Sequence, residues 1–288
     1  RMPGIEVLSD GKILYQGRPI NKYYIEGLDL LEGKYNLANE NLPFKEVTQV
    51  QILENHQPIK ALDSLKFSDQ AALNIKLKNT YTFTGQAHLG SGFSPLLWDA
   101  NITPMLFTKK KQMLATYQAN NTGDNVASQL KKLTIEDLLN QFENNSEKTD
   151  WLSIQQLTTP NFSEKRWLDN NIHLLSGNYL HKLKSDYELR VNASYLNDYQ
   201  QQNGFTNTEF ITPSNTITIL EEKQNHFFFN SLQTNITLQK NADKNYFKNS
   251  LEFQGFWDSQ RGTILLNNQQ LKQQLNNDFF RISNHLKN

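Results

Sequence analysis

The side chains best suited to chemistry in this chain are its histidines, and their spacing does not build a site. They are His56, His88, His173, His181, His226 and His285. No pair has the i, i+4 spacing with which a helix presents two metal ligands, and no cysteine is present to complete a zinc site. His173 and His181 share a strand face but lie about 26 Å apart in an extended strand. We therefore predict no metal site and no cofactor.

Motifs for nucleophilic catalysis and phosphate binding are missing from the sequence. It has no G-x-S-x-G, no G-x-x-x-x-G-K-[ST] and no G-x-G-x-x-G pattern. The glycine-rich stretch 89–93 ends a strand pattern and is typical of a turn. The acidic residues are too scattered to nominate a general acid/base pair. We predict no catalytic residues, and the chain is not expected to be an enzyme.

Composition excludes further classes of protein. The 29 basic and 29 acidic side chains cancel, so the charge gives no case for nucleic-acid binding. Lys109–Lys111 is interpreted as a turn in water, with lipid head groups or periplasmic partners as the alternative. No stretch approaches the ~18 uninterrupted apolar residues of a membrane-spanning helix, and mean hydropathy is −0.65.

The second half of the chain alternates apolar and polar residues. In 186–195 the odd positions are Tyr187, Leu189, Val191, Ala193 and Tyr195, and the even ones are Glu188, Arg190, Asn192 and Ser194. This period of two predicts a strand with one apolar and one polar face. Similar runs predict about eight strands: Tyr81–Phe93, Trp98–Phe107, Gln112–Asn120, Asn171–Leu183, Tyr187–Tyr199, His226–Gln239, Tyr246–Asp258 and Asn277–Leu286.

The links between these strands alternate in length. Short turns at 108–111, 184–186 and 240–245 alternate with long links at 123–170, 200–225 and 259–276, and the first link, 94–97, is short. Barrels of the bacterial outer membrane place short turns on the periplasmic side and long loops outside. Ten strand residues tilted near 40° rise roughly 25 Å, the height of the apolar band of such a barrel. We therefore predict that the apolar strand faces contact lipid.

Residues 1–78 are predicted to form a compact α+β unit. Asp10-Gly11 is a hairpin signal between strands at 5–8 and 13–15, and 17–19 is a further turn. Further strands are expected at 23–27, 50–54 and 72–77, with a short helix or turn at 43–47.

A helix is expected within 125–143. Its apolar residues recur near helical spacing, and Thr134–Asp137 could cap its start. We favour a helix that covers the base of a loop, and the alternative is a helix that forms part of a ligand mouth.

The N-terminal phrases Pro3–Val7, Gly11–Gly17 and Tyr24–Leu30 resemble the plug domain of TonB-dependent outer-membrane receptors. Val47–Asn55 and Ala72–Lys78 stand where such plugs carry two further strands. Two other phrases, 35–38 and 54–62, resemble a Bacteroidetes-type subgroup of these receptors. The chain departs from the common pattern at Glu26, where Asp is usual, and at 55–62, which replaces a Gly-Pro phrase.

The resemblance implies a plug domain at 1–78 and the N-terminal portion of a 22-stranded barrel at 79–288. A plug of this size is roughly 30 Å across, so it needs about 22 strands around it and not eight. The chain is therefore expected to be a fragment with an incomplete barrel. Because no secretion signal follows Arg1, the signal is expected to have been removed or to lie upstream.

The resemblance also implies a function, transport of an extracellular ligand across the Gram-negative outer membrane. The plug would move when the TonB complex pulls a segment that is not present in this chain. Arg18, Glu26 and Asp29 are candidates for pairing with barrel charges, or alternatively are solvated turn residues. The ligand-binding residues are unknown: siderophore, glycan, peptide and cobalamin all stay open, as do signalling in place of import, the oligomeric state and an accessory surface lipoprotein.

Two other functions compete with this interpretation. A soluble or surface-anchored β-rich glycan-binding protein would pack the apolar strand faces against a second sheet. An outer-membrane enzyme barrel, such as a lipase or protease, would need a nucleophile motif that the sequence lacks.

Overall fold

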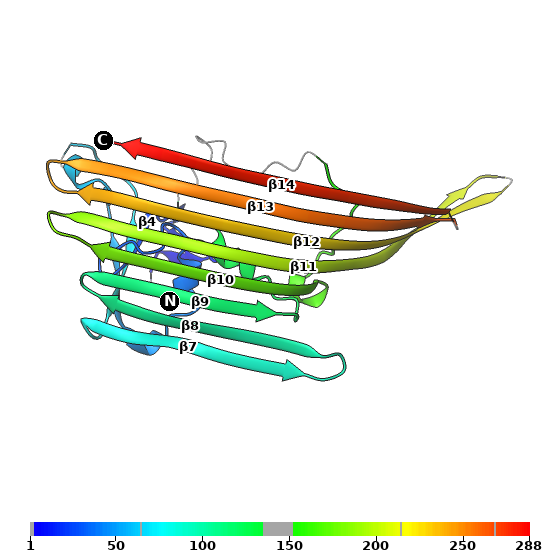
Figure 1. Ribbon diagram of the computed structural model, residues 1–288, viewed down its shortest axis with the longest axis horizontal. Helices are drawn as coiled ribbons and strands as arrows, with labels where there is room; N and C mark the ends of the chain where they lie inside the picture. The colour runs from blue at the N-terminus through cyan, green and yellow to red at the C-terminus, as the bar shows by residue number, and fades with distance from the viewer. Residues whose placement is uncertain (1–2, 64, 135–151, 214, 268) are drawn as a thin grey trace.

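The computed structural model describes residues 3–63, 65–134, 152–213, 215–267 and 269–288. A small mixed region comes first, followed by a large antiparallel sheet (Figure 1). The N-terminal elements are β1 (Ile5–Val7), β2 (Ile13–Tyr15), β3 (Arg18–Pro19), β4 (Lys22–Ile25), α1 (Asn36–Asn39), η1 (Phe44–Glu46), β5 (Val47–Leu53), η2 (Lys60–Leu62) and β6 (Ala72–Leu77). They form two three-stranded sheets, ordered β1-β2-β3 and β4-β6-β5.

The strands and the short helical turn predicted in this region are confirmed within a few residues. The exceptions are β3, which begins inside the expected 17–19 turn, and α1 and η2, which were not predicted. Helix α1 has only four residues, and its N-cap residue, Tyr35, makes no side-chain capping bond. It therefore carries none of the start signals by which a helix is recognised in a sequence.

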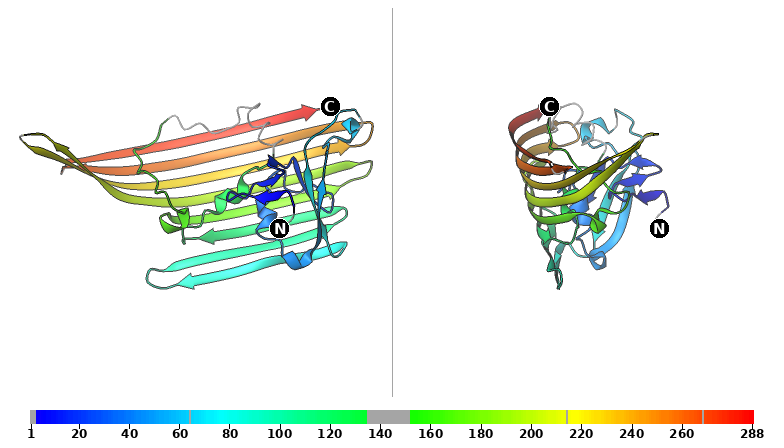
Figure 2. Two further views of the ribbon diagram at one scale, coloured as in Figure 1. Left: turned by 180° about the vertical axis from the view of Figure 1, so that it is seen from behind. Right: turned by 90° about the vertical axis from the view of Figure 1, so that its right-hand side faces the viewer.

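Eight strands form one open sheet in which each strand pairs antiparallel with its neighbour in the chain. They are β7 (Tyr81–Gly92), β8 (Leu97–Thr108), β9 (Lys111–Asn120), β10 (Asp169–Lys182), β11 (Tyr187–Ile211), β12 (Thr216–Asn241), β13 (Tyr246–Leu266) and β14 (Gln269–Lys287). The sheet curves, and the N-terminal region lies on its concave side near the end with the short turns (Figure 2). The predicted class, a mixed N-terminal unit followed by antiparallel strands, is confirmed.

Two of the predicted long links are wrong. Residues 200–225 continue β11 and β12 as a paired ladder from Gln200↔Phe227 to Ile211↔Thr216. Residues 259–276 likewise belong to β13 and β14. The strands therefore extend well beyond β7–β10 (Figure 1). The predicted long link at 123–170 is confirmed in its described parts, which are not paired strand from 123 to 134 and from 152 to 168, and its last two residues begin β10.

The helix predicted within 125–143 is observed only as a 3-10 turn, η3 (Val126–Leu130). The part of the expected helix from residue 135 onward lies outside the described residues. No helix in the described ranges is long and apolar enough to cross a membrane.

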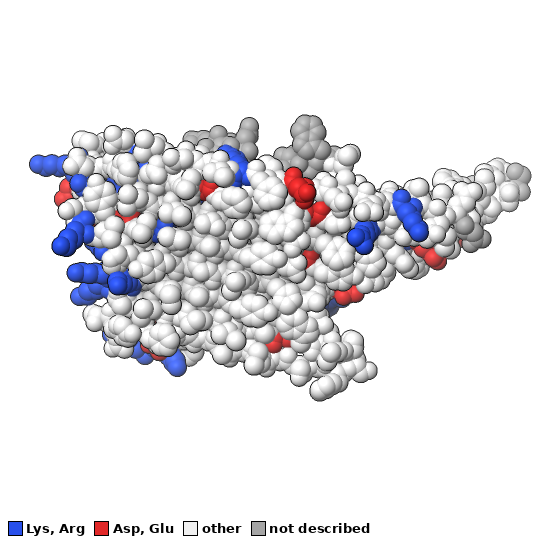
Figure 3. All heavy atoms as spheres, in the orientation of Figure 1, with Lys and Arg blue, Asp and Glu red and all other residues white. Residues whose placement is uncertain are grey.

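The convex face of the sheet is apolar and exposed, whereas the concave face carries polar side chains that are buried. Tyr81, Phe83 and Leu89 on the convex face are 65%, 68% and 76% exposed, and no second sheet covers that face within the described ranges. The concave face carries buried polar side chains, among them Thr103, Gln112, Thr116, Ser176, Asn178, Arg190, Asn192, Thr237 and Ser250. Figure 3 shows that the convex surface is largely uncharged over the apolar residues and that basic side chains gather at the short-turn end.

The exposed apolar side chains are in register from strand to strand. One row runs through Phe83, Leu106, Met113, Tyr179, Val191, Ile236 and Leu251. A second row runs through Ala87, Ile102, Tyr117, Leu175, Tyr195, Leu232, Gly255 and Phe280. The convex face thus carries a continuous apolar band and not scattered apolar residues.

The N-terminal region shares one hydrophobic core with the concave face of the sheet. Buried side chains from β2, β4, α1 and β6, with those of the loops between them, form one cluster: Ile13, Ile20, Tyr23, Ile25, Leu28, Leu30, Leu31, Tyr35, Leu37, Ala38, Leu73, Ile75 and Leu77. The same cluster includes Met105, Phe107, Leu114 and Leu180 from the concave face of the sheet. The sheet is therefore one wall of this core.

Substitution of Gly11 by alanine is expected to destabilise the β1–β2 hairpin by about 2–4 kcal/mol. Its φ of +83° is left-handed, which costs an alanine about 1–2 kcal/mol, and a Cβ there would overlap the Asn36 side-chain amide. That amide is buried and donates to the Asp10 carbonyl at 3.1 Å, a bond that the displaced side chain would lose. Native-state hydrogen exchange of β1 and β2 measures the loss.

Gly17 provides the control for this substitution. It has a similar φ of +79°, but a Cβ added there would have no atom within 4 Å. Gly17→Ala should therefore cost only the backbone part, about 1–2 kcal/mol. Equal losses for the two substitutions would contradict the role assigned to Asn36.

Candidate functional site: the junction between the N-terminal region and the sheet

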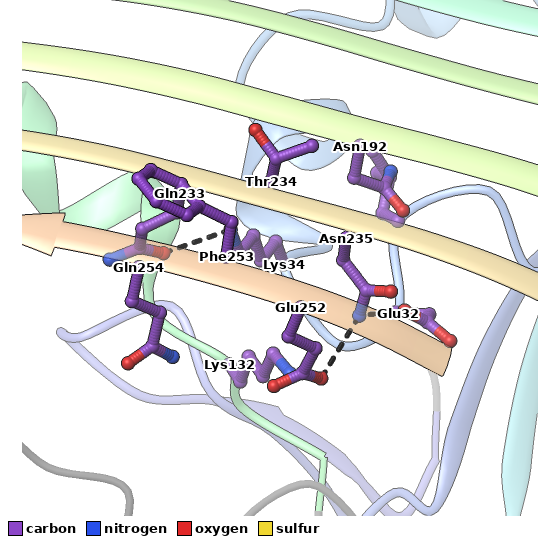
Figure 4. Close-up of a pocket in the computed structure, with 11 residues that line it drawn as sticks. Glu32, Lys34, Lys132, Asn192, Gln233, Thr234, Asn235, Glu252, Phe253 and Gln254 are labelled. Atoms are coloured by element: carbon purple, nitrogen blue, oxygen red, sulfur yellow. Dashed lines mark hydrogen bonds between the residues drawn. The ribbon is translucent and has the colours of Figure 1, made fainter. Parts of the chain in front are cut away.

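An ion-pair cluster joins the N-terminal region to the concave face of the sheet. The Arg190 guanidinium of β11 donates to Glu32 Oε1 at 2.6 Å, and Lys248 Nζ of β13 lies 3.3 Å from the same oxygen. Asn235 of β12 donates to Glu32 Oε2 at 3.1 Å and also to Glu252 at 3.1 Å (Figure 4). One carboxylate of the N-terminal region is thus held by three strands of the sheet.

The electrostatics of this cluster favour the ionised carboxylates. Burial alone would raise the pKa of Glu32, but the charges of Lys248 and Arg190 outweigh it and hold that pKa well below its usual range. Burial likewise opposes ionisation of Asp29, and the nearby positive charges of Lys22 and Arg190 lower its pKa nonetheless. Both carboxylates are therefore charged at neutral pH. Arg190 of the sheet favours the charge of both, and Lys22 of the N-terminal region favours that of Asp29 more strongly.

Amide side chains make a second set of contacts. Asn41 Oδ1 accepts from Gln86 at 2.7 Å and from Asn101 at 2.9 Å, so the end of the α1 turn is bonded to β7 and β8. Gln129, in the η3 turn, bonds both Gln118 of β9 and the Glu40 carboxylate. Polar bonds of this kind exchange with water at a modest net cost, about 1 kcal/mol each.

Sheet side chains also reach the backbone of the N-terminal region. Gln112 donates to the Ile25 carbonyl at 2.6 Å, and Asn192 donates to the Leu30 carbonyl at 3.0 Å. At the short-turn end, Asn241 of β12 donates to the Pro58 carbonyl at 2.8 Å and accepts from the Lys60 amide at 2.9 Å. Apart from the apolar wall near Phe107, the junction is therefore polar.

Two of the three pairing candidates, Arg18 and Glu26, form ion pairs within the N-terminal region. Arg18 forms an ion pair with Asp69 of the same region. Glu26 lies 3.5 Å from Lys76 and accepts from the Leu77 amide at 2.6 Å. Their pairing with the sheet stays a prediction.

Asp29 is the predicted residue that lies closest to the ion-pair cluster. It pairs with Lys22 at 3.1 Å and accepts from the Glu32 amide at 3.0 Å. It also lies close enough to Arg190 for that charge to lower its pKa. Its pairing with the sheet likewise stays a prediction.

Sequence reasoning did not single out Glu32, Lys248 or Asn235. Arg190 appeared only as one of the polar positions of an alternating strand. A charged residue on the inward face of such a strand is a usable signal, because an arginine facing the interior requires a partner. The sequence does not indicate that this partner is Glu32, 158 positions away.

No group of three or more His, Cys, Asp or Glu side chains in the described ranges is placed to hold a metal ion. Several histidines have ordinary neighbours instead. His56 contacts Tyr24 and Asn21, His173 bonds the Tyr117 hydroxyl at 3.0 Å, and His226 bonds the Tyr199 hydroxyl at 2.7 Å.

The attachment of the N-terminal region is expected to weaken on acidification. The pKa values of Glu32 and Asp29 are lowered in the folded state, so their ionisation stabilises it above the unfolded pKa of about 4. This contribution is lost progressively as the pH falls from there toward the folded-state values. Hydrogen exchange of residues 30–37 between pH 7 and pH 3, corrected for intrinsic rates, measures it. Constant protection over that range would contradict the prediction.

Comparison with known proteins gives structural matches only. No protein-family model and no curated protein matches the chain. The alcaligin outer-membrane receptor FauA from Bordetella pertussis matches with a TM-score of 0.26 and 12% identity, over 99% of this chain and 55% of FauA. P. aeruginosa FpvA bound to heterologous pyoverdines matches with a TM-score of 0.28 and 12% identity, over 91% of this chain and 40% of FpvA. The FpvAI–pyocin S2 complex gives the same values.

These structures belong to the class that the N-terminal phrases resemble, TonB-dependent outer-membrane receptors, and the match extends over most of this chain. The chain spans about half the length of FauA and less than half that of FpvA. TM-scores below 0.3 carry no argument about function, so the ligand and activity of this chain have to be argued from its own geometry.

Proposed function

We propose that this chain is part of a TonB-dependent outer-membrane receptor that binds an extracellular ligand and imports it without covalent chemistry. In this proposal residues 1–78 are the plug domain, and residues 79–288 are the N-terminal portion of the barrel. The single observation that carries the proposal is the inverted polarity of the sheet, apolar outside and polar inside. A soluble sheet with one face in water has the opposite arrangement, whereas a barrel in lipid requires this one.

The height of the apolar band supports a membrane of ordinary thickness. Along β11 the band is bordered by Tyr187 at one end and Tyr199 at the other. That length of strand is roughly 40 Å, or about 30 Å of height at a tilt near 40°. Trp257 stacks on Tyr195 and Phe280 near the second border, as aromatic girdles do at membrane interfaces.

The open edges of the sheet require further strands in this proposal. β7 and β14 each pair with one neighbour only among the described residues. In hydrocarbon every unpaired backbone group costs several kcal/mol. We therefore propose that additional strands, from this or another chain, close the barrel around the N-terminal region.

The polar junction supports a plug that can be displaced. Ligand binding at the far end would move the N-terminal region only if the bound state has a different affinity for the sheet. Hydrogen bonds and ion pairs can exchange with water during such a movement, because water takes over both the donors and the acceptors. Glu32, Asp29 and the proposed pairing residues Arg18 and Glu26 are the charges that would have to be released.

Two measurements test the proposal. Trp98 and Trp257 lie near the far border of the band, so lipids brominated on their acyl chains should quench the tryptophan fluorescence of the protein in vesicles. Lack of quenching would refute the membrane placement.

The second measurement is the uptake of candidate siderophores, glycans and peptides. This uptake should depend on the protein and stop when a protonophore collapses the proton gradient. Uptake that persists with the protonophore would refute TonB coupling.

A further inference from the structure

Exposed lysines gather at the short-turn end of the sheet, next to the apolar band. Lys109, Lys110 and Lys111 lie in or beside the β8–β9 turn, Lys184 lies in the β10–β11 turn, and Lys244 lies in the β12–β13 turn. With Lys240 at the end of β12 they form what we call the lysine collar. Figure 3 shows the basic side chains gathered at this edge of the molecule.

The collar begins where the apolar band ends. Lys111 pairs in register with His181, one outward row beyond the row of Met113 and Tyr179. Lys240 pairs in register with Tyr187, and its Nζ lies over the Tyr187 ring, 5.3 Å from the centroid. The ammonium groups therefore lie about 7–14 Å beyond the last apolar side chains toward the short-turn end, a distance of one or two outward-facing residues along a strand.

Three turns at the opposite end of the sheet lack this feature, whereas the link between β9 and β10 at that end carries both basic residues, among them Lys131 and Lys165, and acidic ones, among them Asp124. The turns at 93–96, 212–215 and 267–268 contain no charged residue. The short-turn end does contain acidic residues, Asp186 and Asp243, but fewer of them than lysines. No ion pair joins Lys109, Lys110 or Lys111 to another residue in the described part of the chain. Among the hairpin turns of the sheet, lysines therefore gather at one end, and Lys109, Lys110 and Lys111 are not held in ion pairs within the described residues.

We propose that the lysine collar binds the phosphate head groups of anionic phospholipids in the leaflet at the short-turn end. The inference rests on the proposed membrane placement of the band. Head-group phosphates lie directly beyond the acyl chains, which is where the ammonium groups lie relative to the apolar side chains. A lysine near an anionic bilayer surface contributes about a fivefold increase in lipid affinity, and the collar supplies several lysines around the sheet.

The test uses the intact protein in nanodiscs that contain spin-labelled phosphatidylglycerol or phosphatidylcholine. We expect the protein to hold phosphatidylglycerol about two- to fivefold more strongly at low salt. The preference should approach one in 1 M salt, where the screening length is about 3 Å. The variant K109Q/K110Q/K111Q should lose at least half of the preference. The control K131Q/K165Q/K272Q, which removes as many charges away from the collar, should keep it.

The other outcomes separate the possible failures. Equal binding of both lipids by a protein whose Trp98 and Trp257 are quenched by brominated chains would overturn the collar and leave the membrane placement standing. Absence of quenching would refute the proposed function itself. An equal loss in both triple variants would show that net charge alone is responsible. Displacement of the spin-labelled phosphatidylglycerol by inorganic phosphate at matched ionic strength would show that the lysines bind free anions. That result would overturn the proposed lipid binding.

Discussion

Replacing Glu32 by glutamine is expected to weaken the attachment of the N-terminal region to the sheet by about 3 kcal/mol. The Arg190 side chain is only 4% exposed, so the substitution leaves a buried guanidinium without its ion-pair partner. Removal of one partner from a buried ion pair costs about 3–5 kcal/mol, and the low end applies because Asp29 remains near Arg190. Hydrogen exchange of residues 30–37 should become more than a hundredfold faster.

Two further variants separate the ion pair from other causes. Glu6→Gln removes the same charge from an exposed position in β1. It should change the free energy of opening, as measured by hydrogen exchange, by less than about 0.5 kcal/mol. The double variant E32L/R190M removes both charges and should recover most of the loss, because no uncompensated charge stays buried. A loss below about 1 kcal/mol in Glu32→Gln would mean that water solvates this pair.

The strands of the band could be predicted because the convex and concave faces of the sheet carry opposite residue types, apolar on the convex face and polar on the concave face. That constraint stops near Gln200, where 200–203 is polar at every position. The ladder nevertheless continues to Ile211, because backbone pairing with β12 does not require alternation. An alternation of apolar and polar residues therefore identifies only the part of a strand whose two faces differ in polarity. It does not detect the strand residues beyond that part.

The junction was predicted only in outline. Sequence reasoning identified an N-terminal unit and alternating strands with a polar face, and it named Arg18, Glu26 and Asp29 as candidates for pairing with barrel charges, a prediction that stays open. The observed cluster depends on which residues the sheet brings opposite Glu32, namely Arg190, Asn235 and Lys248. Their sequence separation makes this pairing a consequence of strand register and of the position of the N-terminal region, neither of which a local pattern encodes.

Replacing Ile236 by arginine is expected to destabilise the protein in phospholipid vesicles by about 2–4 kcal/mol, the cost of a charge near the bilayer midplane. Ile236 is 40% exposed and lies in the row with Val191 and Leu251, inside the apolar band. An exposed site of this kind on a soluble protein would tolerate arginine within about 0.5 kcal/mol. The free energy of unfolding in vesicles distinguishes the two cases.

Leu220 supplies the matched control for this substitution. It lies on the same strand and the same face as Ile236 and is also 40% exposed, but it stands on the extension of β12 beyond the band. Leu220→Arg should therefore cost less than about 0.5 kcal/mol. Because the two positions share strand, face and exposure, a large difference between them would come from the medium that each side chain meets. In the proposed membrane placement this medium is hydrocarbon at Ile236 and water at Leu220. Equal and small costs at both positions would place the convex face in water.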